Sequence, residues 1–255
     1  MPTPRPLRLV HTSDVHLGAY DGEGESGADR RSLMEAAFCR VVDLAIESKA
    51  DGLLICGDFF DNDRVRDETV QFAGEQIARF PGRTYLVPGN HDPMDAGRIY
   101  WRYNLEAMAP NLRILRSHAG EYLEDPDLDL VIWGRAFLES DWYFKPLEGL
   151  PERLDHRWHV AMAHGHFVPE GEDTHRSLII NEREIAAAAG HWDYLAFGHW
   201  EPHADVSTGG VTAIYSGAPL ALSDANRRAG WASVVDFDEN GVRWRLEWAD
   251  PRKQL

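Results

Sequence analysis

Five short segments carry side chains that can bind metal ions, and they follow one another in order along the chain. They offer carboxylate, imidazole and amide ligands, and each follows a short apolar run that ends in glycine or another small residue. The segments are Asp14-x-His16, Gly57-Asp58-x-x-Asp61, Gly89-Asn90-His91-Asp92, His164 and Gly198-His199-x-Glu201. Two divalent cations about 3.5–4 Å apart can stabilise both the attacking and the leaving oxygen of an in-line displacement at phosphorus. This ligand set therefore suggests hydrolysis of a phosphoester.

Each segment is weak when taken alone. On extended backbone, Asp14 and His16 project to the same side and can bind one ion together, but a polar strand end would explain the pair as well. Asp58 also suits a helix cap. Asn90 suits a turn, although its carbonyl oxygen is a good neutral ligand for a hard cation. The five segments in order, rather than any one of them, predict a metal site.

Apolar runs of strand length lead into the ligand segments and alternate with helical patterns. Strands are predicted at residues 7–12, 52–56, 85–87, 128–133, 159–163 and 194–197, and helices at 30–48, 67–80 and 182–189. This rhythm implies parallel strands joined by right-handed crossovers. Residues 211–215, 231–237 and 242–248 predict antiparallel strands, the last two joined by a hairpin turn at 238–241. The expected fold class is α/β, with two packed sheets flanked by helices.

Length and composition predict one domain over residues 1–255, without a clear capping domain. No apolar run approaches the roughly 20 residues of a membrane span, and the N-terminus lacks a secretory pattern. Cys39 and Cys56 both lie in apolar patterns, which suits reduced thiols. We therefore expect a cytoplasmic protein that does not contact membranes.

The formal net charge of −16 argues against a surface that binds nucleic-acid phosphates non-specifically through many Lys and Arg contacts. It does not exclude a nucleic-acid substrate, because several carboxylates would be neutralised as metal ligands and a local basic groove can coexist with an acidic exterior. Aromatic and basic residues at 98–103 and 142–145 offer stacking faces, although such clusters are more often core and rim. Arg227 and Arg228 are further candidates for phosphate contact, or a solvated pair.

The motifs resemble those of the calcineurin-like metallophosphoesterases over about residues 7–217. Three segments are most similar in sequence to those of the DNA repair exonucleases of the bacterial SbcD type. The matching segments are His11-Thr-Ser-Asp-Val-His-Leu-Gly18, Gly57-Asp-Phe-Phe-Asp-Asn62 and Tyr215-Ser-Gly-Ala-Pro-Leu220. The resemblance implies a four-layer sandwich of two mixed β-sheets flanked by helices.

The resemblance also implies a role for each ligand residue. Two divalent metal ions are expected, Mn²⁺ first, with iron or zinc as alternatives. One ion would be held by Asp14 and His16, the other by Asn90, His164 and His199, with Asp58 bridging both. His91 would contact the phosphoryl oxygen or protonate the leaving alkoxide, and Asp61 would orient His91. Asp92 either takes part in catalysis or only accepts hydrogen bonds from backbone amides.

The last motif departs from the family pattern. The family usually ends with Gly-His-x-His, whereas this chain has Glu201 in place of the second histidine. Three outcomes are open: Glu201 completes the first metal site and favours a harder cation, His203 takes its place, or the first metal binds weakly. In the segment that starts at His164, that histidine is preferred as the ligand over His166.

Three functions remain in view. The first is a metal-dependent phosphodiesterase acting on DNA, an exonuclease or endonuclease, for which the resemblance alone implies an SMC-like coiled-coil ATPase partner. The second keeps the chemistry but acts on a small nucleotide or other phosphoester, which suits the acidic surface and the short chain. The third is an interaction module that has lost its metals, for which more eroded ligands would be expected.

Overall fold

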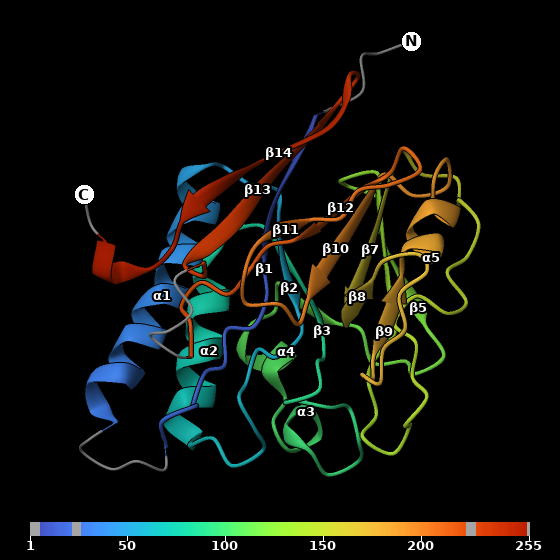
Figure 1. Ribbon diagram of the computed structural model, residues 1–255. Helices are drawn as coiled ribbons and strands as arrows, with labels where there is room; N and C mark the ends of the chain where they lie inside the picture. The colour runs from blue at the N-terminus through green and yellow to red at the C-terminus, as the bar shows by residue number, and fades with distance from the viewer. Residues whose placement is uncertain (1–5, 22–26, 223–227, 254–255) are drawn as a thin grey trace.

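Two six-stranded sheets dominate the computed structural model, which describes residues 6–21, 27–222 and 228–253 (Figure 1). The first sheet has the order β14-β13-β1-β2-β3-β4. Its strands are β1 (Leu7–Thr12), β2 (Gly52–Cys56), β3 (Arg83–Val87), β4 (Leu112–Ile114), β13 (Trp231–Asp238) and β14 (Gly241–Trp248). Strands β1 to β4 are parallel, while β13 runs antiparallel to both β1 and β14. The sheet is therefore mixed.

The second sheet is mixed as well and has the order β11-β12-β10-β7-β6-β5. Its strands are β5 (Glu121–Asp125), β6 (Leu130–Gly134), β7 (Trp158–His164), β10 (Tyr194–Gly198), β11 (Ala204–Asp205) and β12 (Thr212–Tyr215). The four central strands are parallel, and the edge strands β5 and β11 are antiparallel to their neighbours. A small parallel pair, β8 (His166–Val168) and β9 (Ile179–Asn181), lies outside both sheets.

The helices cover the outer faces of the two sheets (Figure 1). They are α1 (Ala28–Glu47), α2 (Asp67–Arg79), α3 (Ile99–Arg102), α4 (Leu105–Met108) and α5 (Glu182–Ala187), with a short 3₁₀ helix at Pro251–Lys253. In α2, Val70, Ala73 and Ile77 are buried at helical spacing, and the helix ends just before Pro81. None of the helices within the described ranges is long and apolar enough to cross a bilayer.

The core forms three apolar layers. Residues from both sheets, such as Leu54 and Met162, meet in the middle layer, while α1 and α2 pack on the outer face of the first sheet. Ile185 of α5 packs with Phe197 on the outer face of the second sheet. Helix, sheet, sheet and helix therefore stack in four layers, which confirms the predicted fold class.

The prediction was wrong for the strand at 211–215. We expected it to be antiparallel, like the hairpin that follows it, but β12 runs parallel to β10, with Thr212 opposite Tyr194. Residues 199–211 provide the crossover that parallel neighbours need. Strands β4, β5, β8, β9 and β11 were not predicted, because they are short or lack a continuous apolar pattern.

His11 is a fully buried imidazole in the layer between the sheets, where its Nδ1 lies 2.8 Å from the Tyr194 hydroxyl. Burial lowers the pKa of His11 to about 3, and the nearby His203 imidazole acts in the same direction. In the unfolded chain the pKa is near 6.5. The unfolded state therefore binds a proton, below about pH 6.5, that the folded state rejects.

We predict that His11→Phe reduces the acid sensitivity of folding. The stability that His11 contributes is intact above about pH 6.5, and it falls by up to about 1.4 kcal/mol per pH unit below that pH. Urea unfolding of chelator-treated protein at pH 7.5 and pH 5 should show a loss that is smaller in the variant by up to about 2 kcal/mol. The exposed His175 provides the control, as His175→Phe. Equal losses in wild type and His11→Phe would contradict the prediction.

Candidate metal centre

The predicted ligands lie where parallel strands of both sheets end, and two glycines allow these ends to approach closely. A Cβ atom at Gly57, after β2, would lie 2.1 Å from the Nδ1 of His164, at the end of β7. A Cβ atom at Gly198, at the end of β10, would lie 1.8 Å from the Cys56 carbonyl oxygen. No side chain fits at either position. The two sheets therefore bring their ligand loops to one shared edge.

Asp14, His16 and Asp58 form the first group, and their ligand atoms lie within 4.8 Å of one another. All three are buried. Asp14 and His16 are not on extended backbone as expected, because these two residues and Asp58 all have a positive φ, of 53°, 50° and 49° respectively. Non-glycine residues adopt this left-handed conformation rarely, and it is concentrated at functional sites. Backbone strain, rather than strand alternation, turns these side chains toward one point.

Asp58 also belongs to a second group, with His164 and His199. The Oδ2 of Asp58 lies 3.2 Å from the Nε2 of His164. The side-chain oxygen of Asn90, Oδ1, lies 3.0 Å from His164 Nε2 and 3.1 Å from His199 Nδ1. The Nδ1 of His164 donates to the Cys56 carbonyl at 3.0 Å, which turns Nε2 toward the cluster. The structure thus brings together every residue predicted for the second metal.

The electrostatics of this edge favour positive charge. Burial opposes a charged imidazole at His164, yet the Asp58 carboxylate raises the pKa of His164 to about 9. Burial would raise the pKa of Asp58 too, but the His164 and His16 imidazoles hold it far below its usual range. Burial raises the pKa of Asp14. For His199, burial and the adjacent His164 lower the pKa to about 3, which leaves a neutral ring with a free lone pair.

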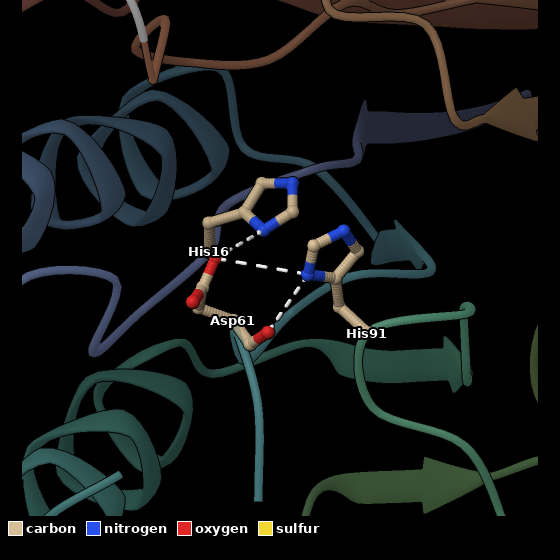
Figure 2. Close-up of side chains that lie close together, drawn as sticks. All are labelled: His16, Asp61 and His91. Carbon is tan, nitrogen blue, oxygen red and sulfur yellow. Dashed lines mark hydrogen bonds and ion pairs between the residues drawn. The ribbon is translucent and has the colours of Figure 1, made fainter. Parts of the chain in front are cut away.

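Asp61 connects the imidazoles of His16 and His91, and these three residues form a third group of close ligand atoms (Figure 2). The Asp61 carboxylate accepts from His16 Nδ1 at 3.1 Å, and its backbone carbonyl accepts from His91 Nδ1 at 2.8 Å. The Asp61 carboxylate is farther from His91, at 3.8 Å. Burial opposes charge on His16, but the bond to Asp61 and the nearby carboxylates raise its pKa. Asp61 is thus placed to orient both rings.

Asp92 is a buried carboxylate that organises the loops around the cluster. It accepts from the backbone amides of Asp58, Phe59, Phe60 and Gly89 at 2.7–3.2 Å. The Tyr100 hydroxyl donates to it at 2.5 Å. Burial and the nearby Asp58 raise the pKa of Asp92 to about 6. Of the two roles considered for Asp92, its contacts match the binding of backbone amides.

A pocket of about 570 Å³ opens beside His91 and Asn90. The His91 side chain is 43% exposed and, with Nδ1 engaged by Asp61, its Nε2 remains for a ligand. Asp61, Asn62 and Arg98 line the pocket further out. A reacting group bound at the cluster would therefore have space next to it for the rest of a substrate.

Comparison with known proteins agrees with this geometry. The calcineurin-like phosphoesterase family matches residues 7–200, which is most of the chain. The chain belongs to the calcineurin-like phosphoesterases. Among solved structures, one crystal structure aligns with a TM-score of 0.58 at 15% identity, covering 96% of this chain and 99% of the other. The protein TT1561 of Thermus thermophilus aligns with a TM-score of 0.57 at 14% identity, covering 96% of this chain and 100% of its own. At such identities these two structures support the fold alone.

Family membership and the ligand groups together make this chain a metal-dependent phosphoesterase, a hydrolase that binds divalent cations. The donor set fits such ions, because carboxylate and amide oxygens suit hard cations and imidazoles suit borderline ones. The side-chain oxygen of Asn90 and the Nδ1 of His199 lie 3.1 Å apart, so both can reach one ion.

The structure does not bring Glu201 into the ligand groups found among the described residues. Its Oε1 accepts from the Leu222 backbone amide at 3.0 Å. The His203 ring packs 4.8 Å from the ring of Trp244, on the hairpin strand β14. His166 accepts from the Trp200 indole at 2.9 Å. The ligand that completes the first metal site therefore stays a prediction.

The other residues noted in the sequence have varied positions. Trp101, Trp142 and Tyr143 are exposed on the surface, and Arg98 lines the pocket. Arg227 lies outside the described residues. Sequence patterns gave no sign of the Cys56 carbonyl that orients His164, nor of the Tyr100 bond to Asp92, because backbone acceptors and distant hydroxyls leave no motif.

We predict that Asp58→Asn abolishes most of the stabilisation conferred by manganese. Wild-type protein should gain about 2.7 kcal/mol at a manganese concentration one hundred times Kd, observed as a raised Tm. The variant loses the carboxylate shared by both groups, so its Tm should barely respond. Asp43→Asn, on the surface of α1, serves as the matched control. A full response in Asp58→Asn would refute a shared ligand at this position.

Glu201→Gln tests the departure from the family pattern. Because its carboxylate is bonded to Leu222, we expect this change to reduce the manganese response less than Asp58→Asn does. The same thermal titration, extended to His203→Gln, measures all three variants on one scale. A loss equal to that of Asp58→Asn would establish Glu201 as a ligand.

Proposed function

We propose that this phosphoesterase is dinuclear and hydrolyses phosphodiesters, with DNA as the favoured substrate. One observation carries the dinuclear part of the proposal: Asp58 belongs to two separate groups of ligand atoms. A carboxylate shared in this way suits two ions close enough to act on one phosphoryl group. The similarity of the motifs to those of SbcD-type nucleases supports DNA as the substrate. The oxygen-rich ligand set supports Mn²⁺ as the metal.

In the proposed mechanism the residues divide the work between binding and proton transfer. Asp14, His16 and Asp58 would hold one cation, and Asp58, Asn90, His164 and His199 would hold the other. When bound, the cations supply charge stabilisation of the phosphoryl oxygens and an activated water. His91 protonates the leaving alkoxide through Nε2, because its Nδ1 is held by the Asp61 carbonyl. Asp61 holds the imidazole rings of His16 and His91 in fixed orientations.

A small nucleotide or other phosphoester is the second candidate substrate. The pocket beside His91 favours it, because its volume of about 570 Å³ suits a compact ligand. Four carboxylates line this pocket and the formal net charge of the chain is −16, so a long polyanion would meet repulsion. The metal-free interaction module is disfavoured by the intact ligand groups. A cytoplasmic location and an SMC-like ATPase partner remain predictions.

Hydrolysis assays separate these candidates. With manganese present, wild-type protein should cleave bis(p-nitrophenyl) phosphate, and cleavage of labelled single-stranded or double-stranded DNA would select the nuclease. His91→Ala should lower kcat by about 10²–10⁴ through loss of the proton donor. His191→Ala, at an exposed position, should keep wild-type rates. Absence of turnover on every ester with every divalent metal would overturn the proposal.

A further inference from the structure

The pocket beside His91 is lined by several charged side chains whose partners can be assigned one by one. Four are acidic, namely Asp21, Asp61, Asp63 and Glu139, and two are arginines, Arg64 and Arg98. A charged group in a pocket attracts a ligand most strongly when no protein group already neutralises it. The charge balance of the lining therefore indicates what the pocket binds.

All four carboxylates of the lining are engaged. The Asp61 carboxylate accepts from His16 Nδ1 at 3.1 Å and from the side-chain amide of Asn62 at 2.9 Å. Asp63 and Glu139 both bind the guanidinium of Arg98. Arg98 is thus neutralised by two carboxylates.

Asp21 also lines the pocket, and one of its two carboxylate oxygens is bonded. Its Oδ2 accepts from the Arg66 backbone amide and from the Thr69 hydroxyl, both at 2.9 Å. It thereby anchors the segment before α2 to the loop after β1. Each carboxylate of the lining thus has at least one partner, and among the described residues none of the four pairs with Arg64.

Arg64 is the charged side chain of the lining that lacks such a partner. Within residues 6–21, 27–222 and 228–253, no hydrogen bond or ion pair reaches its guanidinium, and the residue is exposed. Its backbone, however, is fixed, because its amide donates to Asn62 Oδ1 at 2.7 Å and Asn62 in turn binds Asp61. Since the Asp61 carbonyl holds His91, Arg64 has a defined position relative to the proposed proton donor.

We propose that Arg64 is a specificity-determining residue that binds a second phosphate of the substrate, beyond the phosphoryl group that is cleaved. The proposal rests on the proposed function, because it assumes that hydrolysis occurs at the cluster next to the pocket. A guanidinium recognises phosphate oxygens through charge-assisted and often bidentate hydrogen bonds. The preferred substrates are then phosphoesters with two phosphates, and esters with one phosphate bind without help from Arg64.

Short thymidine oligonucleotides with one or two phosphates test this directly. The substrates are dTpdT, with one phosphodiester, pdTpdT, with an added terminal phosphate, and dTpdTpdT, with a second phosphodiester and a third thymidine. Arg64→Gln should raise KM about tenfold for the latter two and leave KM unchanged for dTpdT and bis(p-nitrophenyl) phosphate. A larger effect on pdTpdT assigns the contact to a terminal phosphate, and a larger effect on dTpdTpdT assigns it to the DNA backbone.

Two variants and a binding measurement complete the design. Arg64→Lys should restore part of the preference for the second phosphate, and Arg183→Gln, at an exposed ion pair with Glu170, should match wild type. Calorimetry on chelator-treated protein compares the affinities for dTpdT and pdTpdT without turnover, so the inference can be judged even if no ester is hydrolysed. An equal change for all substrates, or no change in either KM or binding, would overturn the role of Arg64.

Discussion

Negative charge buried at one sheet edge is the constraint on which the rest of this structure depends. Asp14 and Asp58 lie almost fully buried within one group of ligand atoms. Two carboxylates so placed repel each other unless positive charge or protons lie between them. The raised pKa of His164 is the consequence within the protein, since its imidazole retains a proton to balance Asp58. A divalent cation would displace that proton and balance the same negative charge, so the electrostatics of this edge favour cation binding.

The fold supplies the rigidity that keeps this charge in place. Strands from both sheets end at the same edge, and β2, β7 and β10 approach closely enough that only glycine fits at Gly57 and Gly198. The left-handed backbone at Asp58 is stabilised by Asp92, whose carboxylate accepts hydrogen bonds from the amides of Asp58, Phe59 and Phe60. Strain persists only where surrounding contacts determine it. Here the buried carboxylate of Asp92 provides those contacts, and the layers of apolar residues behind it resist relaxation.

The sequence predicted the parts that depend on local pattern. Short buried strands such as β2 and the amphipathic helix α2 have clear sequence patterns, and the ordered motifs named residues that the structure brings into groups of possible ligands. The parallel pairing of β12 was missed because period alone carries no strand direction. The attachment of His16 to Asp61 was also missed, since it joins residues 45 positions apart through a contact that no motif encodes. The pocket and the balance of its charges depend on the positions of several loop segments in space, which the sequence cannot supply.

Glu201 stands where the family pattern has a histidine, and both its backbone and its side chain bind other parts of the chain. Trp200, immediately before it, stacks 4.7 Å from Tyr215 and donates to His166, so the direction of the following residue is fixed from one side. On the other side, the Glu201 backbone carbonyl accepts from Ala218 and its carboxylate accepts from Leu222. Glu201 thus anchors the segment after β12. A histidine that bound a metal at this position would leave the Leu222 amide without that carboxylate. A change from Glu201 to histidine would therefore alter the bonding of this segment as well as the side chain at position 201.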